Sequence, residues 1–199
     1  MAHPSDAAVW ETWESVFLKT TALGNMIIER SLASGQRITR IAFVPRGGLY
    51  LVNILSRMLG LSGDQVISLG VSKYSREQPA QAGDFKIGQL PDRSHVAGQV
   101  VLLVDEVHDT GRTAEWVRHA LTELGASAVP MAVIHYKPGA NATSYEPDFY
   151  IETTNGWVHY PWEPIDSLGS VYQAALRQQA LLASPGHPGG SQPGPPVRI

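Results

Sequence analysis

Residues able to bind a sugar, a metal ion and a phosphate follow one another in the middle of the chain. Val100–Val104 is an unbroken apolar run, which is typical of a buried strand in a parallel sheet. Asp105 and Glu106 come directly after it, and their carboxylates could bind sugar hydroxyls or a hydrated metal ion. The turn Asp109–Thr113 then opens a predicted helix over Ala114–Leu124. Backbone N–H groups and hydroxyls at such a helix start form an anion site, so a phosphate cradle is expected beside the acids.

A second turn of the same kind lies earlier in the sequence. Ile38–Val44 is predicted to be a strand and Leu49–Leu59 a helix, with Pro45-Arg46-Gly47-Gly48 between them. Two adjacent glycines let the backbone approach a ligand closely, and the Arg46 guanidinium offers two donors to a phosphate. A plain strand–turn–helix without a ligand is the alternative for either turn alone. The pair of turns favours a binding site at the carboxyl edge of a sheet.

Together these turns resemble the ribose-phosphate signature and the pyrophosphate loop of the type I phosphoribosyltransferases, and the likeness extends over most of residues 8–165. The resemblance implies that Asp105 and Glu106 hold the ribose hydroxyls, directly or through hydrated Mg²⁺. It also implies a cis peptide bond between Pro45 and Arg46. The implied 5′-phosphate site is formed by Asp109, Thr110, Gly111, Arg112 and Thr113. The implied pyrophosphate site is formed by Pro45, Arg46, Gly47 and Gly48.

The C-terminal third resembles the xanthine–guanine and related 6-oxopurine branch of that family. A predicted strand over Ala128–Tyr136 runs into Lys137-Pro138-Gly139, and an aromatic segment, Asn155–Glu163, follows a short strand at residues 149–151. In that branch the lysine donates to the 6-oxo group of the purine, the aromatic ring stacks on the base, and the next backbone lies near the purine 2-position. The implied base-binding residues are Lys137, Trp157, Val158 and Glu163.

A long polar segment separates the two halves of the predicted sheet. Val66–Val71 is predicted to be a strand, and residues 72–98 then form a connection long enough to be a lid over the site. The family has a mobile hood here, so Tyr74 is expected to help exclude water, and a hairpin is expected around Gly83–Gln89. The resemblance implies two catalytic residues: Tyr74 in the lid, and Asp109, which accepts the proton from purine N7.

Patterning predicts an α/β fold, a mainly parallel, twisted sheet with helices on both faces, and the family resemblance implies a small hood or cap in addition. The 199 residues are 43% hydrophobic, enough for one domain over residues 1–183. Residues 8–34 have helical spacing, with Asp6 able to cap the helix start and Gly35 its end, and a break at Gly24 is an alternative. Residues 184–199 are dense in Pro, Gly and Ser, which predicts a disordered tail.

Charge and the missing residue types limit the partners. The net charge is −3 and the pI is near 6.1, so nucleic acid and anionic membranes are not expected partners. No cysteine is present, which excludes disulfides and thiolate chemistry. A cytoplasmic protein that forms a homodimer or homotetramer is expected.

The implied reaction joins a purine base to 5-phosphoribosyl-1-pyrophosphate (PRPP), giving a nucleoside 5′-monophosphate and pyrophosphate, with Mg²⁺ as cofactor. Xanthine, guanine and hypoxanthine are the expected bases. Alternatives are transfer to adenine, orotate or uracil, and a non-catalytic regulator that senses PRPP on the same fold. Lys137 argues against adenine, because an ammonium group can donate to an oxo group but not to an amino group.

Overall fold

The structure is a computed structural model that describes residues 7–73, 85–163, 169, 172–177 and 179. The chain divides into two compact units, Met1–Val158 and His159–Ile199. The predicted disordered tail lies outside the described residues, and the predicted single domain over residues 1–183 stays a prediction.

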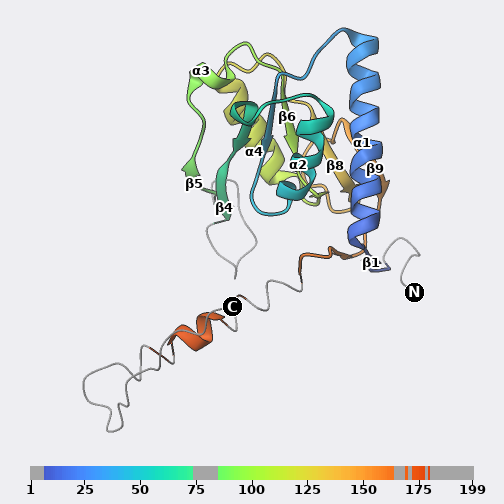
Figure 1. Cartoon of the computed structure of the whole chain (residues 1–199), viewed down its shortest axis with the longest axis vertical. Coiled ribbons are helices and arrows are strands. Elements are labelled where there is room, and N and C mark those ends of the chain that lie inside the picture. Colours follow the sequence, from blue (N-terminus) through green and yellow to red (C-terminus); the bar gives the residue numbers. More distant parts are fainter. Residues whose placement is uncertain (1–6, 74–84, 164–168, 170–171, 178, 180–199) are drawn as a thin grey trace, which may run out of the picture. The chain divides into compact units, whose positions relative to one another are not determined.

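A parallel sheet forms the centre of the first unit, and Figure 1 labels its strands β6, β8 and β9. The strand order is β3-β2-β6-β8-β9, and β7 also pairs with β8. All strand pairings described within this sheet are parallel. Its strands are β2 (Arg40–Phe43), β3 (Val66–Ser68), β6 (Val101–Val104), β7 (Val107–His108), β8 (Met131–Tyr136) and β9 (Phe149–Thr153). The predicted parallel sheet is therefore confirmed.

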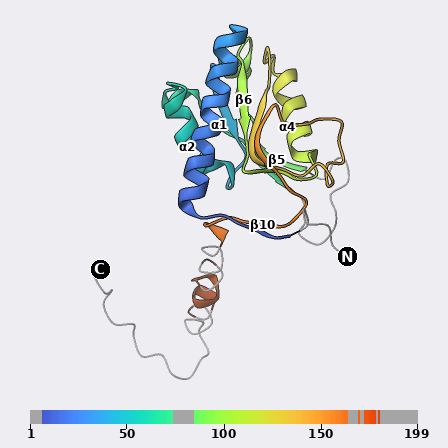
Figure 2. The ribbon, with the colours of Figure 1, turned by 90° about the vertical axis from the view of Figure 1, so that its right-hand side faces the viewer.

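Helices cover both faces of this sheet. Figure 2 shows α1 (Trp13–Ser34) and α2 (Gly48–Met58) on one side of β6, and α4 (Arg112–Glu123) on the other. Side chains of α4 pack with alternate sheet residues in one buried cluster, and α1 and α2 contact the opposite face. The core members from α4 are Ala114, Val117 and Leu121, and those from β2 and β6 are Ala42, Val101 and Leu103.

The first helix is continuous, and its start differs from the prediction. Thr12, not Asp6, is the N-cap: its side chain accepts from the Ser15 amide, while the Ser15 hydroxyl accepts from the Thr12 amide. This reciprocal box satisfies two amides that the first helical turn leaves unpaired. Gly24 does not break the helix, because a side chain there would collide with Met58 of α2, so the glycine lets the two helices pack closely. Gly35, in the left-handed region at φ 69°, ends the helix as predicted.

The predicted strand over Val66–Val71 is wrong in one respect, because the chain changes sheets at Leu69. The Leu69 amide still donates to the Phe43 carbonyl of β2, at 2.9 Å. Beyond it, β4 (Gly70–Lys73) leaves the parallel sheet and pairs antiparallel with β5 (Phe85–Gln89). Of the hairpin predicted around Gly83–Gln89, the structure describes one strand, β5, and the partner strand β4 lies outside the predicted range. Gly83 and Tyr74 lie outside the described residues.

Shorter elements complete the described chain. They are β1 (Val9–Trp10), a 3₁₀ turn η2 (Gly63–Gln65), α3 (Arg93–Val96) and β10 (Val158–His159). The amide of Val9 in β1 donates to the Trp157 carbonyl at 2.8 Å, which ties the N-terminal arm to the aromatic segment. In the second unit, residues 172–177 are helical, within the expected final helix. Among the helices described, none combines the length and apolar character that crossing a membrane requires.

Candidate active site

The two acids after β6 occupy a break between two short strands. Both β6 and β7 pair with β8, and Asp105 and Glu106 lie between them in sequence. The Glu106 carbonyl accepts from the amides of Ile134 and His135, at 3.2 and 3.1 Å, so the backbone of the break is fixed to β8. Both acids therefore stand at the carboxyl edge of the parallel sheet, where open α/β folds bind ligands.

Negative charge at this break is unfavourable without a ligand. Burial raises the pKa of the Asp105 carboxyl well above its usual range, and the neighbouring Glu106 raises it further. The same Asp105 carboxylate accepts the Glu106 amide at 3.0 Å. Two carboxylates side by side offer the hard oxygen ligands that Mg²⁺ prefers, so this donor set fits the magnesium ion implied by the sequence.

The loop Pro45–Gly48 lies directly against these acids. The peptide bond between Pro45 and Arg46 is cis, as the family resemblance implied. A side chain at Gly47 would collide with the Glu106 carboxylate, and one at Gly48 would lie 2.7 Å from the Val104 carbonyl. The two glycines therefore allow the predicted pyrophosphate loop to reach the predicted ribose acids.

The predicted phosphate turn borders a cavity. Gly111, at φ 75°, is the N-cap of α4, and its carbonyl accepts from the Glu115 amide at 2.9 Å. The cavity has a volume of about 220 Å³ and joins Asp105 to most of the predicted phosphate residues. It is lined by Asp105, Val107, His108, Asp109, Thr110, Gly111, Thr113, Ala114 and Met131. Arg112 is exposed and is absent from this lining.

A loop that the sequence did not single out supports the phosphate turn. A side chain at Gly111 would lie 2.6 Å from Asn141 Oδ1 and 2.7 Å from Thr143 Oγ1, so only glycine fits between them. The Ala142 amide donates to the Thr110 carbonyl at 3.0 Å. Asn and Thr in a loop are too common to have marked this segment as part of the site.

His108 is a buried neighbour of the cavity. Its ring is 2% exposed and makes edge contacts with the rings of Tyr136 and Tyr145. Burial lowers the pKa of His108, which favours the neutral ring. The packing explains why a histidine is accommodated among apolar neighbours.

Three residues of the predicted base site come together beyond the acids. Lys137 follows β8 and is 7% exposed, and its Nζ lies 3.8 Å from Asp109 Oδ1. The same Nζ lies 5.4 Å from the ring centroid of Trp157, a cation–π distance. Trp157 is 62% exposed, whereas Val158 is buried. One residue of the predicted set, Glu163, belongs to the second unit, where its carboxylate contacts His159 Nδ1 at 3.3 Å.

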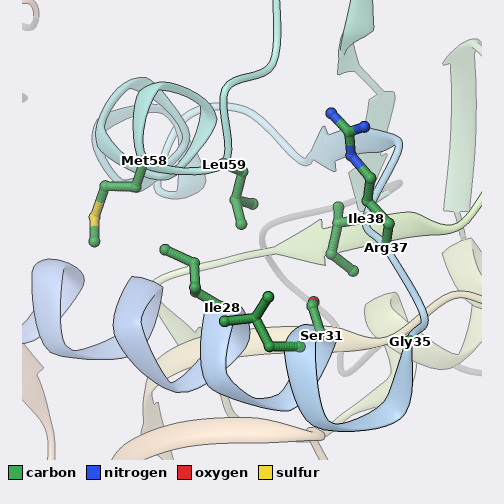
Figure 3. Close-up of a pocket in the computed structure, with 8 residues that line it drawn as sticks. Ile28, Ser31, Gly35, Arg37, Ile38, Met58 and Leu59 are labelled. Atoms are coloured by element: carbon green, nitrogen blue, oxygen red, sulfur yellow. The ribbon is translucent and has the colours of Figure 1, made fainter.

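A larger hollow of about 470 Å³ lies away from these residues (Figure 3). It is formed by the C-terminal halves of α1 and α2 and the segment that enters β2, the opposite edge of the sheet. Its lining is mainly apolar, and none of the residues predicted to do chemistry reaches it. The lining residues are Ile28, Ser31, Leu32, Gly35, Arg37, Ile38, Met58 and Leu59.

A second ionisable cluster escaped the sequence analysis. Glu11, Lys19, His135 and Glu152 meet on the α1 side of the sheet. These residues are scattered over the chain without a motif, so only the pairing of β8 with β9 and the packing of α1 bring them together.

Comparison with known proteins supports the resemblance seen in the sequence. Residues 20–166 match the model of the phosphoribosyl transferase domain. A purine phosphoribosyltransferase from Pyrococcus horikoshii is 31% identical, with 78% of this chain and 94% of that one covered and a TM-score of 0.61.

Two more distant solved structures share the fold. The xanthine-guanine-hypoxanthine phosphoribosyltransferase of Helicobacter pylori is 20% identical over 82% of this chain and 99% of that one, with a TM-score of 0.65. A hypothetical protein from Neisseria gonorrhoeae with bound ppGpp is 23% identical over 87% and 99% of the two chains, with a TM-score of 0.63. With a domain match over most of its length and a relative above 30% identity, this chain belongs to the phosphoribosyltransferase family.

Proposed function

We propose that the protein transfers the 5-phosphoribosyl group of PRPP to a purine with a 6-oxo group. The main support for this proposal is that the Lys137 side chain contacts both Asp109 and Trp157 at one edge of the sheet. In a 6-oxopurine the O6 and N7 atoms are neighbours on one edge of the base. Lys137 Nζ and Asp109 Oδ1, 3.8 Å apart, match these two atoms as a donor to O6 and an acceptor for the N7 proton.

The reaction forms a bond between purine N9 and ribose C1 while the bond from C1 to pyrophosphate breaks. Carbon C1 carries positive charge in the transition state, as in other glycosyl transfers. Asp109 takes the proton from N7, so the transferred base becomes neutral. Trp157 offers an exposed aromatic face for stacking.

The sugar and its phosphates fit the rest of this edge. Asp105 and Glu106 would hold the ribose hydroxyls and Mg²⁺, which when bound adds positive charge beside the leaving pyrophosphate. The Thr110–Thr113 turn at the start of α4 would bind the 5′-phosphate, and Arg46 would donate to pyrophosphate. The similarity to the purine phosphoribosyltransferase from Pyrococcus horikoshii supports a purine as the acceptor.

Self-association is also proposed. Large apolar side chains on α1 and α2 are exposed, among them Trp13 at 49%, Phe17 at 54% and Leu49 at 50%. Burying such side chains against a second copy would remove apolar surface from water. Sedimentation velocity at micromolar concentration should show a dimer or tetramer, and a monomer there would contradict it.

A pyrophosphate-release assay with PRPP, Mg²⁺ and a panel of bases tests the reaction. Guanine, xanthine or hypoxanthine should turn over, and adenine should be slower by roughly 10⁴–10⁵, because its amino group cannot accept a hydrogen bond from the Lys137 ammonium. Lys137→Ala should reduce that preference. Trp157→Ala should weaken all purines alike, by about 1–3 kcal/mol. Efficient use of adenine would refute the base assignment, and no turnover of any base would favour the regulator.

A further inference from the structure

Four ionisable side chains form a compact cluster on the α1 side of the sheet. Lys19 Nζ lies 2.5 Å from Glu11 Oε1 and 2.9 Å from Glu152 Oε2. His135 Nε2 lies 3.3 Å from the same oxygen of Glu11 and 3.3 Å from Glu152 Oε2. The side chains of Glu11 and His135 are 2% and 0% exposed, whereas those of Lys19 and Glu152 are 19% and 44% exposed, so the cluster is buried on its Glu11 and His135 side.

The cluster contains its own cation. Burial alone would raise the pKa of Glu11, yet hydrogen bonds from Lys19 and Ser15 lower it overall. Burial would likewise lower the pKa of Lys19, but its bonds to Glu11 and Glu152 raise it. Lys19 therefore takes the place that a metal ion would take between the two carboxylates. Such a buried, hydrogen-bonded ion pair holds its partners in one arrangement.

The first connection from the cluster to the base site runs from Glu11 along the adjacent strand β1 to Trp157. Glu11 lies between strand β1 and Thr12, the cap of α1. Two residues before Glu11, the Val9 amide donates to the Trp157 carbonyl at 2.8 Å. Fixing Glu11 thus fixes the short arm that holds the Trp157 backbone.

The second connection runs from His135 along strand β8 to Lys137. His135 on β8 is paired in register with Glu152 on β9, and Lys137 follows two residues after His135. The Thr154 amide donates to the Tyr136 carbonyl at 3.0 Å, which continues the pairing toward the end of both strands. The cluster thus ties together α1, β8 and β9 just before the chain reaches the two base-contacting residues.

We propose that Glu11, Lys19, His135 and Glu152 are positioning residues for the base pocket. They act through two others: Trp157, held by the Val9 amide, and Lys137, carried by β8. This inference rests on the proposed purine transfer. It makes the N-terminal arm part of the base site, whereas the PRPP-binding turns at Pro45–Gly48 and Asp109–Thr113 do not depend on it.

Two variants test the connection from different ends. Glu11→Gln removes the charge that Lys19 pairs with, and Val9→Pro removes the amide that holds Trp157 without touching the cluster. Each should raise the KM for the purine by about tenfold, since small displacements of a positioning group are costly. The KM for PRPP and kcat should change less than about twofold, because the sugar site is anchored elsewhere. Ala8→Pro is the matched control, and it should behave like the unchanged protein.

A measurement that does not depend on catalysis distinguishes failure of the positioning role from failure of the proposed purine transfer. Hydrogen–deuterium exchange over residues 155–158 should speed up in Glu11→Gln and Val9→Pro but not in Ala8→Pro. If the unchanged protein turns over no purine while exchange behaves as expected, the proposed function fails and the mechanical link stands. A folded Glu11→Gln or Val9→Pro with an unaltered purine KM, or with purine and PRPP parameters worsening together, would overturn the positioning role.

Discussion

Two groups of carboxylates lie on the same sheet, and their pKa values are shifted in opposite directions because their neighbours differ. Asp105 and Glu106 stand at the carboxyl edge between β6 and β7, and burial with a neighbouring acid raises the pKa of Asp105. Glu11 and Glu152 lie beside His135 of β8 on the α1 side, and hydrogen bonds from Lys19 and Ser15 together outweigh burial and lower the pKa of Glu11. One group favours uptake of a proton or cation, whereas the other already holds its cation.

Whether the chain itself supplies a cation to the carboxylates distinguishes a ligand-binding site from a structural ion pair better than the distances between the oxygen and nitrogen atoms do. Glu11, His135 and Glu152 offer ligand atoms that all lie within 4.8 Å of one another, which by distance alone resembles a metal site. Lys19 supplies the positive charge there, so the two carboxylates already have a cation from within the chain. At Asp105 the second acid adds negative charge, and a cation from outside is needed to stabilise it.

The largest expected effect comes from a third acid at the sheet edge. Asp109→Asn should lower kcat by about 10²–10⁴ while PRPP binding largely survives, because the amide cannot accept the N7 proton. Steady-state kinetics with guanine or hypoxanthine measures it. The double change Asp105→Asn with Glu106→Gln should instead weaken PRPP and Mg²⁺ binding. Equal losses of PRPP affinity in both variants would contradict this division of roles.

The next largest effect is on the free energy of unfolding, which should change in different directions when an acid of each group is neutralised. Glu11→Gln should lower the free energy of unfolding by about 1–3 kcal/mol at neutral pH, because the partly buried Lys19 loses a charged acceptor. Asp105→Asn should leave that free energy unchanged or raise it, since it removes a destabilising buried charge. Urea unfolding in the absence of Mg²⁺ and PRPP measures both. Destabilisation by Asp105→Asn as large as that by Glu11→Gln would erase the contrast.

The two contiguous turns of the candidate site were predictable from the sequence. The turns Pro45–Gly48 and Asp109–Thr113 each follow an apolar strand, and parallel strands bring their carboxyl ends to one edge. The meeting of Gly47 with Glu106 follows from that topology. Lys137 and Trp157 required the family resemblance, because an isolated lysine after a strand could equally extend into solvent.

Residues that meet through tertiary packing were not predictable. Lys19 on α1 has no sequence relation to Glu152, and only the pairing of β8 with β9 sets His135 beside that glutamate. The split of Val66–Val71 was missed for a similar reason, since the partner strand β5 lies beyond a long connection. Asn141 and Thr143 contact the site through a loop whose residue types occur in most turns.

The pH dependence of stability should carry opposite signs for the two acids. Glu11 has a lowered pKa in the folded protein, so its contribution is present above the ordinary glutamate pKa of about 4.3 and is lost as pH falls through the lowered value. Asp105 has a raised pKa, so folding gains stability as pH falls through that value toward about 3.9. Unfolding of Glu11→Gln and Asp105→Asn, compared with the unchanged protein from pH 7 down to about 3, should show these opposite deviations. Parallel curves for both variants would contradict the assigned shifts.

The smallest effect tests whether Lys19 alone keeps metal out of the cluster. His135 Nε2 lies 3.3 Å from each glutamate oxygen, close to the ligand–ligand spacing expected around tetrahedral Zn²⁺ with bonds of about 2.1 Å. Lys19→Met removes the ammonium group and leaves two carboxylates and an imidazole that need a cation. Zinc should then stabilise the variant by about 1 kcal/mol at a concentration about five times its Kd, seen as a higher melting temperature. The unchanged protein, and Lys19→Met with Glu152→Gln, should show no such rise. Equal zinc stabilisation of the unchanged protein would mean that Lys19 does not occupy the cation position, and the contrast between the two carboxylate groups would fail.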